Sequence, residues 1–399
     1  MSDKGLNVSV EKVKLLRKST ASSEVTFATS IAHFANDVPL TLLPAVLPIL
    51  IEEFDLSYAA AGAAITTSGL LMTSLQAVTG YVADRRNRIS LLLLGLTTLG
   101  VGTILIGFST NYVQILAFGC LMGIGGSVFH PIGYSLLSDA FESGNRGKAL
   151  GLGSAAGDIA VPVAFATSGF LAPVLGWRNL FVIWGLIAIV TAVILPLIIK
   201  EPRTKVFHSK ATGNSTKTIV RRLIPVFIAM GLAAASYKIA SSFVTTYLND
   251  YFELRIESAN FILALMMFVG TVGSVVGGTL VDKFGERTTV TAEMVMLGVL
   301  STVSVYIGDV YFLSGMICIM GFFMLGVWPS FYSVIAGSTT LGARAFMYGI
   351  LFAVAWSFGS FFPYISGVCA DIFGLQVIYV LMGGLSLVAA LTAYFTFKK

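Results

Sequence analysis

The chain carries two copies of one short pattern, and the distance between them constrains how it can fold. The copies run from Gly80 to Arg88 and from Gly278 to Arg287, which places Asp84 and Asp282 198 residues apart. The same offset, without a gap, pairs many further residues of the two halves: Leu50, Phe54 and Leu56 with Leu248, Phe252 and Leu254; Cys120 with Cys318; Gly123 and Pro131 with Gly321 and Pro329; Arg146 with Arg344; and Gly151, Gly169 and Gly176 with Gly349, Gly367 and Gly374. A register held over so many positions indicates an internal duplication, so we expect two related halves.

Long apolar stretches recur along the whole chain. Of its 399 residues, 56% are hydrophobic and only 11% are charged, which leaves too little polar surface to cover a soluble protein of this size. Stretches long enough to span a bilayer, at least about 18 residues, occur at 27–51, 59–83, 89–109, 112–138, 148–172, 178–199, 223–249, 258–281, 288–308, 311–337, 345–370 and 374–397. Such continuous runs exclude the short alternating strands of a membrane β-barrel. We predict an all-α integral membrane protein with twelve transmembrane helices, six in each half.

The basic residues predict how the chain is oriented in the membrane. With the amino terminus inside, the inner segments hold 22 of the 25 Lys and Arg residues, as cytoplasmic loops do. Residues 1–24 then form a cytoplasmic tail without a signal-peptide core, and 200–222 form a basic cytoplasmic linker between bundles at 25–199 and 223–399. The net charge of +5 reflects this orientation and gives no indication of nucleic-acid binding. We expect a multi-pass protein of the cell membrane with both termini in the cytoplasm.

The two six-helix halves, the basic linker and the Gly-x-x-x-Asp-Arg pattern after the second helix, with its second copy after the eighth, together resemble the major facilitator superfamily over the whole chain. The resemblance implies an inner-face gate in each half, formed by Gly80, Asp84, Arg85 and Arg88 and by Gly278, Asp282 and Arg287. Asn87 stands where the pattern usually has glycine, which is a mild departure because Asn is among the few residues that tolerate a left-handed turn. An alternative is that the glycines only permit close helix packing and the charges only solvate a loop.

Within this family, the first half is similar to the fosmidomycin-resistance group of drug exporters. The similarity lies in His33-Phe34-Ala35-Asn36-Asp37, followed by Leu43-Pro44 and Leu47-Pro48, and in Gly123-x-Gly125 leading to Phe129-His130-Pro131. It implies proton-driven export of small polar, often anionic, organic molecules. Ile132, where that group favours an acidic residue, departs from the pattern. The predicted substrate and direction of transport depend on this closer similarity, whereas the predicted fold depends on the whole chain.

A polar cluster in the first span distinguishes the two halves. At the repeat offset, His33, Asn36 and Asp37 are opposed by Gly231, Ala234 and Ala235. Their i, i+3 and i+4 spacing places the three polar residues on one helical face. An ionisable side chain in hydrocarbon is costly, so this face should line a cavity or meet a partner. We predict Asp37 as the proton-carrying carboxylate with His33 beside it and Asn36 in contact with substrate; the alternative is a permanently paired structural anchor.

His130 and Trp328 occupy equivalent positions in the two halves, and each is followed by a proline. An imidazole at this depth can titrate or donate a hydrogen bond to a substrate, which makes His130 a candidate binding residue. It could equally satisfy a backbone carbonyl that the proline leaves free. Trp328, with Tyr332 one turn later, is expected to form an aromatic wall of the binding cavity.

Lys238 is the only Lys or Arg residue that lies away from the ends of the predicted spans. A lysine this deep cannot easily reach either surface, so it requires a carboxylate or an anionic substrate. Ser242 continues its helical face and Tyr237 flanks it, so we predict that all three contact substrate. The alternative is that Lys238 belongs to an ion pair that only holds the halves together.

Asp158, between Gly157 and Pro162, is a second candidate proton site. Its repeat partner is Trp356, which we expect to line the cavity opposite. Glu293 lies near the inner start of the ninth span, where we expect it to cap the helix or pair locally.

The predicted function is secondary transport of a small polar organic molecule, with an anion expected, by alternating access. Proton-coupled efflux is the first hypothesis. Proton symport or facilitated uptake of an organic acid or sugar is the alternative, and a membrane sensor or channel is a candidate of another class. No phosphate-binding loop of an ATPase is found, and no enzyme is expected. Three His and three Cys residues, scattered along the chain, argue against a metal centre or another cofactor. The expected partners are a small-molecule substrate, protons and the lipid bilayer, with the protein a monomer.

Overall fold

The computed structural model of the chain describes residues 3–83, 85–141, 146–199, 213–338, 350 and 352–397. Within these ranges the protein is built from helices, and no β-strand occurs. This confirms the predicted all-α class.

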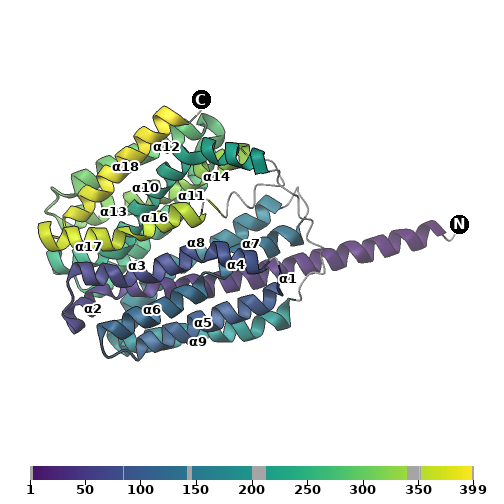
Figure 1. Cartoon of the computed structure of the whole chain (residues 1–399), viewed down its shortest axis with the longest axis horizontal. Coiled ribbons are helices and arrows are strands. Elements are labelled where there is room, and N and C mark those ends of the chain that lie inside the picture. Colours follow the sequence, from purple (N-terminus) through teal and green to yellow (C-terminus); the bar gives the residue numbers. More distant parts are fainter. Residues whose placement is uncertain are drawn as a thin grey trace.

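Helices of the first half form one group (Figure 1). They are α1 (Asp3–Ala45), α2 (Leu47–Phe54), α3 (Tyr58–Ser74), α4 (Gln76–Ala83), α5 (Arg88–Gly107), α6 (Tyr112–Gly126), α7 (Phe129–Ala140), α8 (Arg146–Leu175) and α9 (Trp177–Ile198). The predicted amino-terminal tail is not separate from the first span, because α1 continues from Asp3 and projects beyond the bundle (Figure 1).

Helices of the second half form a second group beside the first (Figure 1). They are α10 (Gly213–Phe252), α11 (Ile256–Phe284), α12 (Glu286–Ser304), α13 (Val310–Gly326), α14 (Trp328–Ser338), the π-helix η1 (Phe352–Trp356), α16 (Ser357–Ser360), α17 (Phe362–Phe373) and α18 (Val377–Thr396). Much of the predicted linker at 200–222 lies outside the described residues, but its last part is helical because α10 begins at Gly213.

Nine helices in the described ranges are long and apolar enough to cross a membrane, or ten if α1 and α2 count as one bent span. The bend between these two helices is 49°. It follows from Pro44 and Pro48, which remove backbone donors around Val46. The two other expected spans are helical but less regular: α3 and α4 are interrupted at Leu75, and α12 includes the charged Glu286, Arg287 and Glu293.

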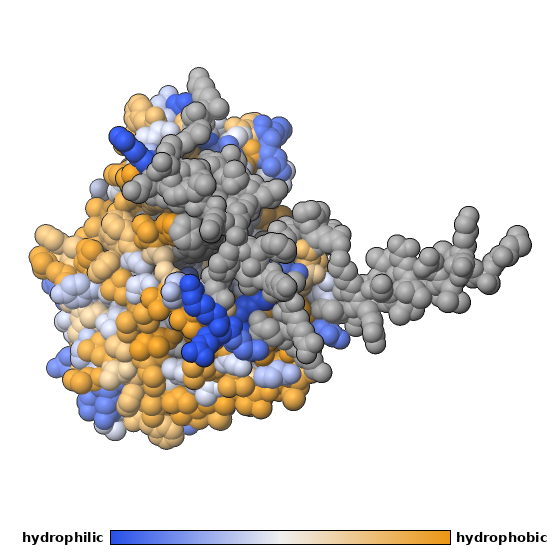
Figure 2. All heavy atoms as spheres, turned by 45° about the vertical axis from the view of Figure 1, so that its right-hand side comes forward, coloured by the Kyte–Doolittle hydropathy of each residue, from blue (hydrophilic) through white to orange (hydrophobic). Residues whose placement is uncertain are grey.

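The surface of the helical body agrees with a multi-pass membrane protein. Large apolar side chains are exposed on many helices, with Leu197 82%, Val174 78% and Val275 72% exposed. Figure 2 shows hydrophobic residues spread broadly over the visible face of the described part. Exposed apolar area of this extent is unstable in water and matches lipid as the surrounding solvent.

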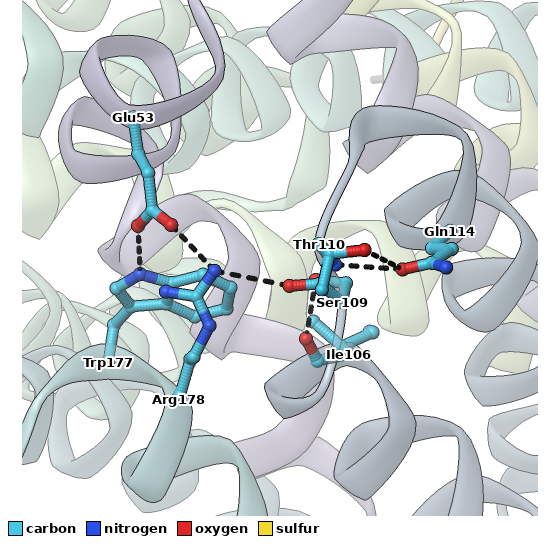
Figure 3. Close-up of polar contacts among 7 residues, drawn as sticks. All are labelled: Glu53, Ile106, Ser109, Thr110, Gln114, Trp177 and Arg178. Atoms are coloured by element: carbon cyan, nitrogen blue, oxygen red, sulfur yellow. Dashed lines mark hydrogen bonds and ion pairs between the residues drawn. The ribbon is translucent and has the colours of Figure 1, made fainter.

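A polar cluster fixes the short helix α2 to the rest of the first half (Figure 3). Trp177 donates from Nε1 to a Glu53 carboxylate oxygen over 2.7 Å, and Arg178 donates to the other oxygen over 2.6 Å. The same guanidinium also donates to the Ser109 carbonyl over 3.1 Å. The cluster therefore joins α2, the start of α9 and the loop between α5 and α6 at one end of the bundle. We call this the Glu53 end, and the opposite end, which carries the loop after α4 and Gly285, the motif end.

Candidate functional site

His33 and Asp37 of α1 form a pair inside the first half. The Nε2 atom of His33 lies 3.2 Å from an Asp37 carboxylate oxygen, as the i, i+4 spacing allows. The His33 side chain is 4% exposed and that of Asp37 is 19% exposed, so the carboxylate is the more accessible member. His33 also stacks on Phe129, with the ring centroids 4.6 Å apart. The imidazole is thus held in place while the carboxylate remains within reach of water.

His130 of α7 completes this cluster. Its ring centroid is 5.2 Å from that of His33, in an edge-to-face arrangement. Nδ1 of His130 is buried and has no hydrogen-bond partner among the described residues. One ligand atom from each of His33, Asp37 and His130 lies within 4.8 Å of the others, a grouping that could hold a metal ion. Sequence separation had argued against such a grouping, and it arises because α1 and α7 pack side by side.

Asn36 of α1 also contacts the Asp37 carboxylate. Its amide Nδ2 donates to the Asp37 carboxylate over 2.9 Å, and the residue is fully buried. This position favours a role in orienting Asp37 over the predicted contact with substrate.

Lys238 of α10 faces the cluster from the second half. Among the described residues, no carboxylate lies within 4.0 Å of its ammonium nitrogen, so no ion pair neutralises it. Its nitrogen instead lies 5.7 Å from the ring centroid of Trp356, at the range of a cation–π contact. The proposed permanent pair between the halves is therefore not formed in this conformation.

Three aromatic residues of the second half build a wall next to Lys238. Trp328 and Trp356 stack with their centroids 5.1 Å apart, and Tyr237 meets Trp356 edge-on at 5.6 Å. Trp356 ends the π-helix η1, a type of local widening that often marks functional positions. Its Nε1 is buried without a partner in the described ranges, which leaves a donor for a solute or water. The repeat partners of the two tryptophans are the titratable His130 and Asp158, so equivalent positions carry different chemistry.

The remaining predicted residues are placed differently. Asp158 of α8 is exposed but lies beside the cluster, because it follows Gly157, whose built Cβ would be 2.3 Å from Nε2 of His33. Ser242 is fully buried and does not line the cavity described next, and Ser241 takes that position. Tyr332 is half-buried against the apolar core. The difference between the two serines follows from the helical register of α10, where the face that carries Lys238 continues to the residue at i+3.

A small cavity lies between the halves beside these residues. It is lined by Leu40, Thr41, Pro44, Ile65, Ser68, Gly69, Met72, Tyr237, Lys238 and Ser241 and has a volume of about 50 Å³. That is room for a few water molecules, since roughly 10–15 Å³ measured in this way holds one. A larger solute would need the halves to separate further in this region.

The halves are packed closely at the Glu53 end along α3 and α17. A Cβ at Gly62 would lie 2.1 Å from the Pro363 carbonyl oxygen, and one at Gly367 would lie 2.2 Å from that of Tyr58. Asp371 of α17 accepts hydrogen bonds from the amides of Tyr58 and Ala59, over 2.8 and 2.9 Å. A carboxylate at the first turn of a helix satisfies otherwise unpaired donors. This seam was not predicted, although Gly367 was recognised as a repeated glycine.

A second seam relates α8 to α11 in the same way. Gly169, the repeat partner of Gly367, packs on Asn260 and Glu257, with a built Cβ 3.2 Å from each. Asn260 is fully buried, donates to the Ala45 carbonyl over 2.8 Å and accepts from Thr245 over 3.2 Å. It therefore ties the bend after α1 to the second half. A buried asparagine within an apolar span was the signal that sequence reasoning missed.

The repeated motifs lie at the opposite end of the bundle. Asp84 falls outside the described residues. Arg88 pairs with Asp139 over 2.7 Å, within the first half, and Arg85 donates to the Tyr81 carbonyl over 2.9 Å. In the second copy Asp282 is exposed and Arg287 lies over the Tyr394 ring at 4.6 Å. None of these contacts joins the two halves.

Within each motif, the first glycine lies at a helix contact, whereas a later residue lies in the turn that follows the helix. Built Cβ atoms at Gly80 and Gly278 would lie 3.4 and 3.9 Å from the equivalent prolines Pro131 and Pro329, so both glycines sit at helix contacts. Asn87 does not use the left-handed conformation that it could tolerate. Its φ is −65°, and its side chain caps α5 by accepting from the Ser90 amide. Its repeat partner Gly285 has a positive φ of 78°.

Comparison with known proteins agrees with this architecture. The model of the Major Facilitator Superfamily matches the chain twice, over residues 27–225 and 226–399. The fosmidomycin resistance protein of Escherichia coli is 24% identical over 386 residues, covering 94% of each chain. The cis,cis-muconate transport protein of Acinetobacter baylyi is 25% identical over 279 residues, covering 65% of this chain and 66% of that protein.

Solved structures share the fold at low sequence identity. A bacterial homologue of the human lysosomal transporter Spinster, in an inward-facing and unoccupied conformation, aligns with a TM-score of 0.83 at 18% identity, over 94% of this chain and 97% of that one. A mutant of the nucleoside transporter NupG aligns with a TM-score of 0.78 at 13% identity, over 94% of this chain and 100% of that one. The double match of the family model over nearly the entire length places the chain in the Major Facilitator Superfamily, as a membrane transporter and not an enzyme.

Proposed function

We propose that the protein exports a small polar organic anion in exchange for protons, by alternating access. The observation that carries this proposal is the unpaired Lys238 ammonium at the interface between the halves, opposite the His33–Asp37–His130 cluster of the described residues. An uncompensated cation at this depth is costly unless an anion or water reaches it. The names of the similar proteins, which refer to fosmidomycin resistance and to muconate transport, are in keeping with an organic anion.

Asp37 would carry the exchanged proton. Its carboxylate contacts a histidine, accepts from Asn36 and is partly accessible, so its protonation can follow the side to which the site is open. An anion bound at Lys238 and a proton bound at Asp37 change the local charge in opposite directions. By charge alone each therefore favours binding of the other. Exchange requires that the bound solute excludes the proton from Asp37, and the direction of proton movement in vesicles separates exchange from proton symport.

The packing of the seams suggests which conformation this is. The halves are in backbone contact at the Glu53 end, and the described contacts of the motif residues remain within single halves. With the motif loops facing the cytoplasm, as the distribution of basic residues predicts, the closed end faces outward. The conformation would then be inward-facing, and transport would require the α3–α17 and α8–α11 seams to open.

Purified protein in lipid vesicles tests the direction of coupling. With a pH-sensitive dye inside the vesicles, entry of solute raises the internal pH if protons leave in exchange and lowers it if protons enter with the solute. Fosmidomycin and cis,cis-muconate are the first solutes to use. A rise supports the proposal, a fall supports proton symport, and the absence of any solute flux over a broad set of organic acids, sugars and antibiotics favours a sensor.

Lys238→Met is expected to weaken binding of an organic anion by about tenfold or more, because a hydrogen bond to a charged group contributes about 1.5–3 kcal/mol. Binding of a neutral analogue should change little. Isothermal titration against the first anion that stabilises the wild-type protein measures both affinities. Arg255→Gln is a matched control, since Arg255 is 83% exposed and remote from the site. Equal anion affinity in Lys238→Met and the wild type would remove Lys238 from the binding site.

A further inference from the structure

Glu293 of α12 is a buried carboxyl group that the proposed transport cycle does not use. The residue is 3% exposed, and neither of its carboxyl oxygens has a hydrogen-bond partner among the described residues. It does not cap α12, which begins at Glu286, and it makes no local ion pair in these ranges. The expectation of a capping or paired Glu293 is therefore wrong. An ionised carboxylate is very unfavourable in such surroundings, so the group is stable here only with its proton bound.

The helices around Glu293 leave room for its carboxyl group. A Cβ at Gly326 of α13 would lie 2.7 Å from Oε1 of Glu293, and one at Gly277 of α11 would lie 3.1 Å from the same atom. Any larger residue at either position would displace the carboxyl group. The two glycines thus form a niche that is open only because they lack side chains.

The first half shows that this niche is not a general feature of the repeat. At the repeat offset, Glu293, Gly326 and Gly277 correspond to Gly95, Val128 and Thr79. In the first half the position that corresponds to Glu293 is a glycine, and the position that corresponds to Gly326 is a valine. A Cβ at Gly95 would lie 2.5 Å from the Val128 side chain. Large and small residues have exchanged places, and only the second half has an acid in the space. Either arrangement fills the space between the helices. Packing therefore does not require an acid, and the acid is a specific feature of the second half.

The other charged and titratable groups nearby do not neutralise Glu293. The helices packed against α12 are α11, α13, α14 and α18. Together with α12 they carry Asp282, Lys283, Glu286, Arg287, Cys318, Tyr332 and Tyr394 at the motif end or in mid-helix. Arg287 is six residues away, about 9 Å along the helix axis, and lies over Tyr394, while Glu286 accepts from Ser333 over 2.8 Å. No cation of the described ranges is within ion-pair distance of Glu293.

An apolar cavity lies next to the carboxyl group. It has a volume of about 220 Å³ and is lined by Leu280, Phe284, Met296 and Phe323, with Glu293 in its wall. Phe284 and Met296 are 53% and 43% exposed, so the cavity opens on the apolar surface. Apolar molecules match this lining, whereas entry of an ion would require its desolvation.

We propose that Glu293 is a proton-binding site of the second half, separate from the His33–Asp37–His130 cluster, which holds its proton while α11, α12 and α13 pack as they do here. Loss of that proton requires the Gly277–Gly326 niche to open to water. The protonation of Glu293 is thereby coupled to the packing of α11, the helix that also forms the α8–α11 seam and carries Asp282 in its last turn. This inference does not depend on the direction of transport or on proton coupling at Asp37.

Dicyclohexylcarbodiimide tests the site because it is lipid-soluble and reacts with protonated carboxyl groups. The carboxyl oxygen bonds to the central carbon of the reagent while the proton passes to one of its nitrogens; the adduct rearranges to an N-acylurea, and nothing is released. Wild-type protein in lipid vesicles at pH 7 is expected to be modified at Glu293, located by peptide mass spectrometry. Glu286, half-buried at the start of α12, should stay unmodified. A water-soluble carbodiimide should not modify Glu293.

Two variants separate a proton site from a structural residue. Glu293→Gln keeps the shape of a protonated carboxyl group, so it should retain the melting temperature of the wild type at pH 7 and lose the modification. Glu293→Gly combined with Gly326→Val recreates the arrangement of the first half and should fold without the modification. The proposal is overturned if folded wild-type protein is not modified at Glu293 by the lipid-soluble reagent, or if Glu293→Gln melts well below the wild type, because an ionised and paired carboxylate would then be present.

Discussion

Replacing Asp37 by asparagine is expected to abolish solute accumulation driven by a pH gradient while leaving exchange of labelled for unlabelled solute intact. Asparagine is nearly isosteric and can keep the contacts with Asn36 and His33, but it cannot bind and release a proton. Exchange requires only alternating access of the loaded site, whereas accumulation requires coupling. Both are measured in the same preparation of vesicles, with and without an imposed gradient.

Asp55→Asn is the matched control for this variant. Asp55 is exposed after α2 and has a φ of 48°, a left-handed conformation that asparagine also tolerates. The Asp55→Asn variant should accumulate solute like the wild type. Accumulation that persists in Asp37→Asn would assign the proton to another group, with His130 and Asp158 the next to examine, whereas loss of exchange together with accumulation would point to a structural role of Asp37.

Gly367→Leu is expected to abolish transport by holding the Glu53 end open. Even the first side-chain atom at this position would lie 2.2 Å from the Tyr58 carbonyl oxygen, a backbone atom that cannot move alone. Overpacking costs about 1–3 kcal/mol, which shifts the balance between open and closed seams by about 5- to 150-fold. Gly62→Leu, on the facing helix and 2.1 Å from the Pro363 carbonyl oxygen, should have the same effect.

The opening of the seam can be measured independently of transport. Thr66 is 8% exposed, and its hydroxyl accepts from the Tyr364 amide across the seam. In a background without Cys120, Cys318 and Cys369, a Thr66→Cys variant should react slowly with a membrane-impermeant thiol reagent, and much faster once Gly367→Leu is added. Gly384→Leu on α18 is the control, because no atom of the described residues lies within 4 Å of its built Cβ. Normal transport by Gly367→Leu would show that this seam need not close.

Much of the fold could be predicted because it follows from local sequence properties. Apolar runs of spanning length must form helices in a bilayer, where no water can satisfy backbone groups. The repeat at one offset then gives two related halves, and the prolines of α1 mark its bend. The start of α10 was less predictable. Residues 213–222 are polar, but their backbone simply extends the following helix.

The sequence predicted the individual residues of the candidate site, but it did not predict how they are arranged in space. Ionisable side chains in apolar spans are rare enough to identify His33, Asp37, His130 and Lys238 directly. Their mutual placement depends on how α1, α7 and α10 pack. Sequence could not distinguish Ser241 from Ser242 on the cavity wall, since a rotation of α10 by one residue exchanges them.

The membrane class, the duplication and the polar residues inside the spans could be predicted from the chain, because each of these depends on hydropathy, periodicity or residue identity along it. Which groups meet became known only from the packing of the helices: among the described residues, these are the stacked Trp328 and Trp356, the unpaired Lys238, the seams at Gly62 and Gly367, and the niche around Glu293. These depend on distances between helices that are far apart in sequence. At the seams and the niche these distances are short because particular glycines lack side chains. The sequence does not show which glycines act in this way until the facing helix is known.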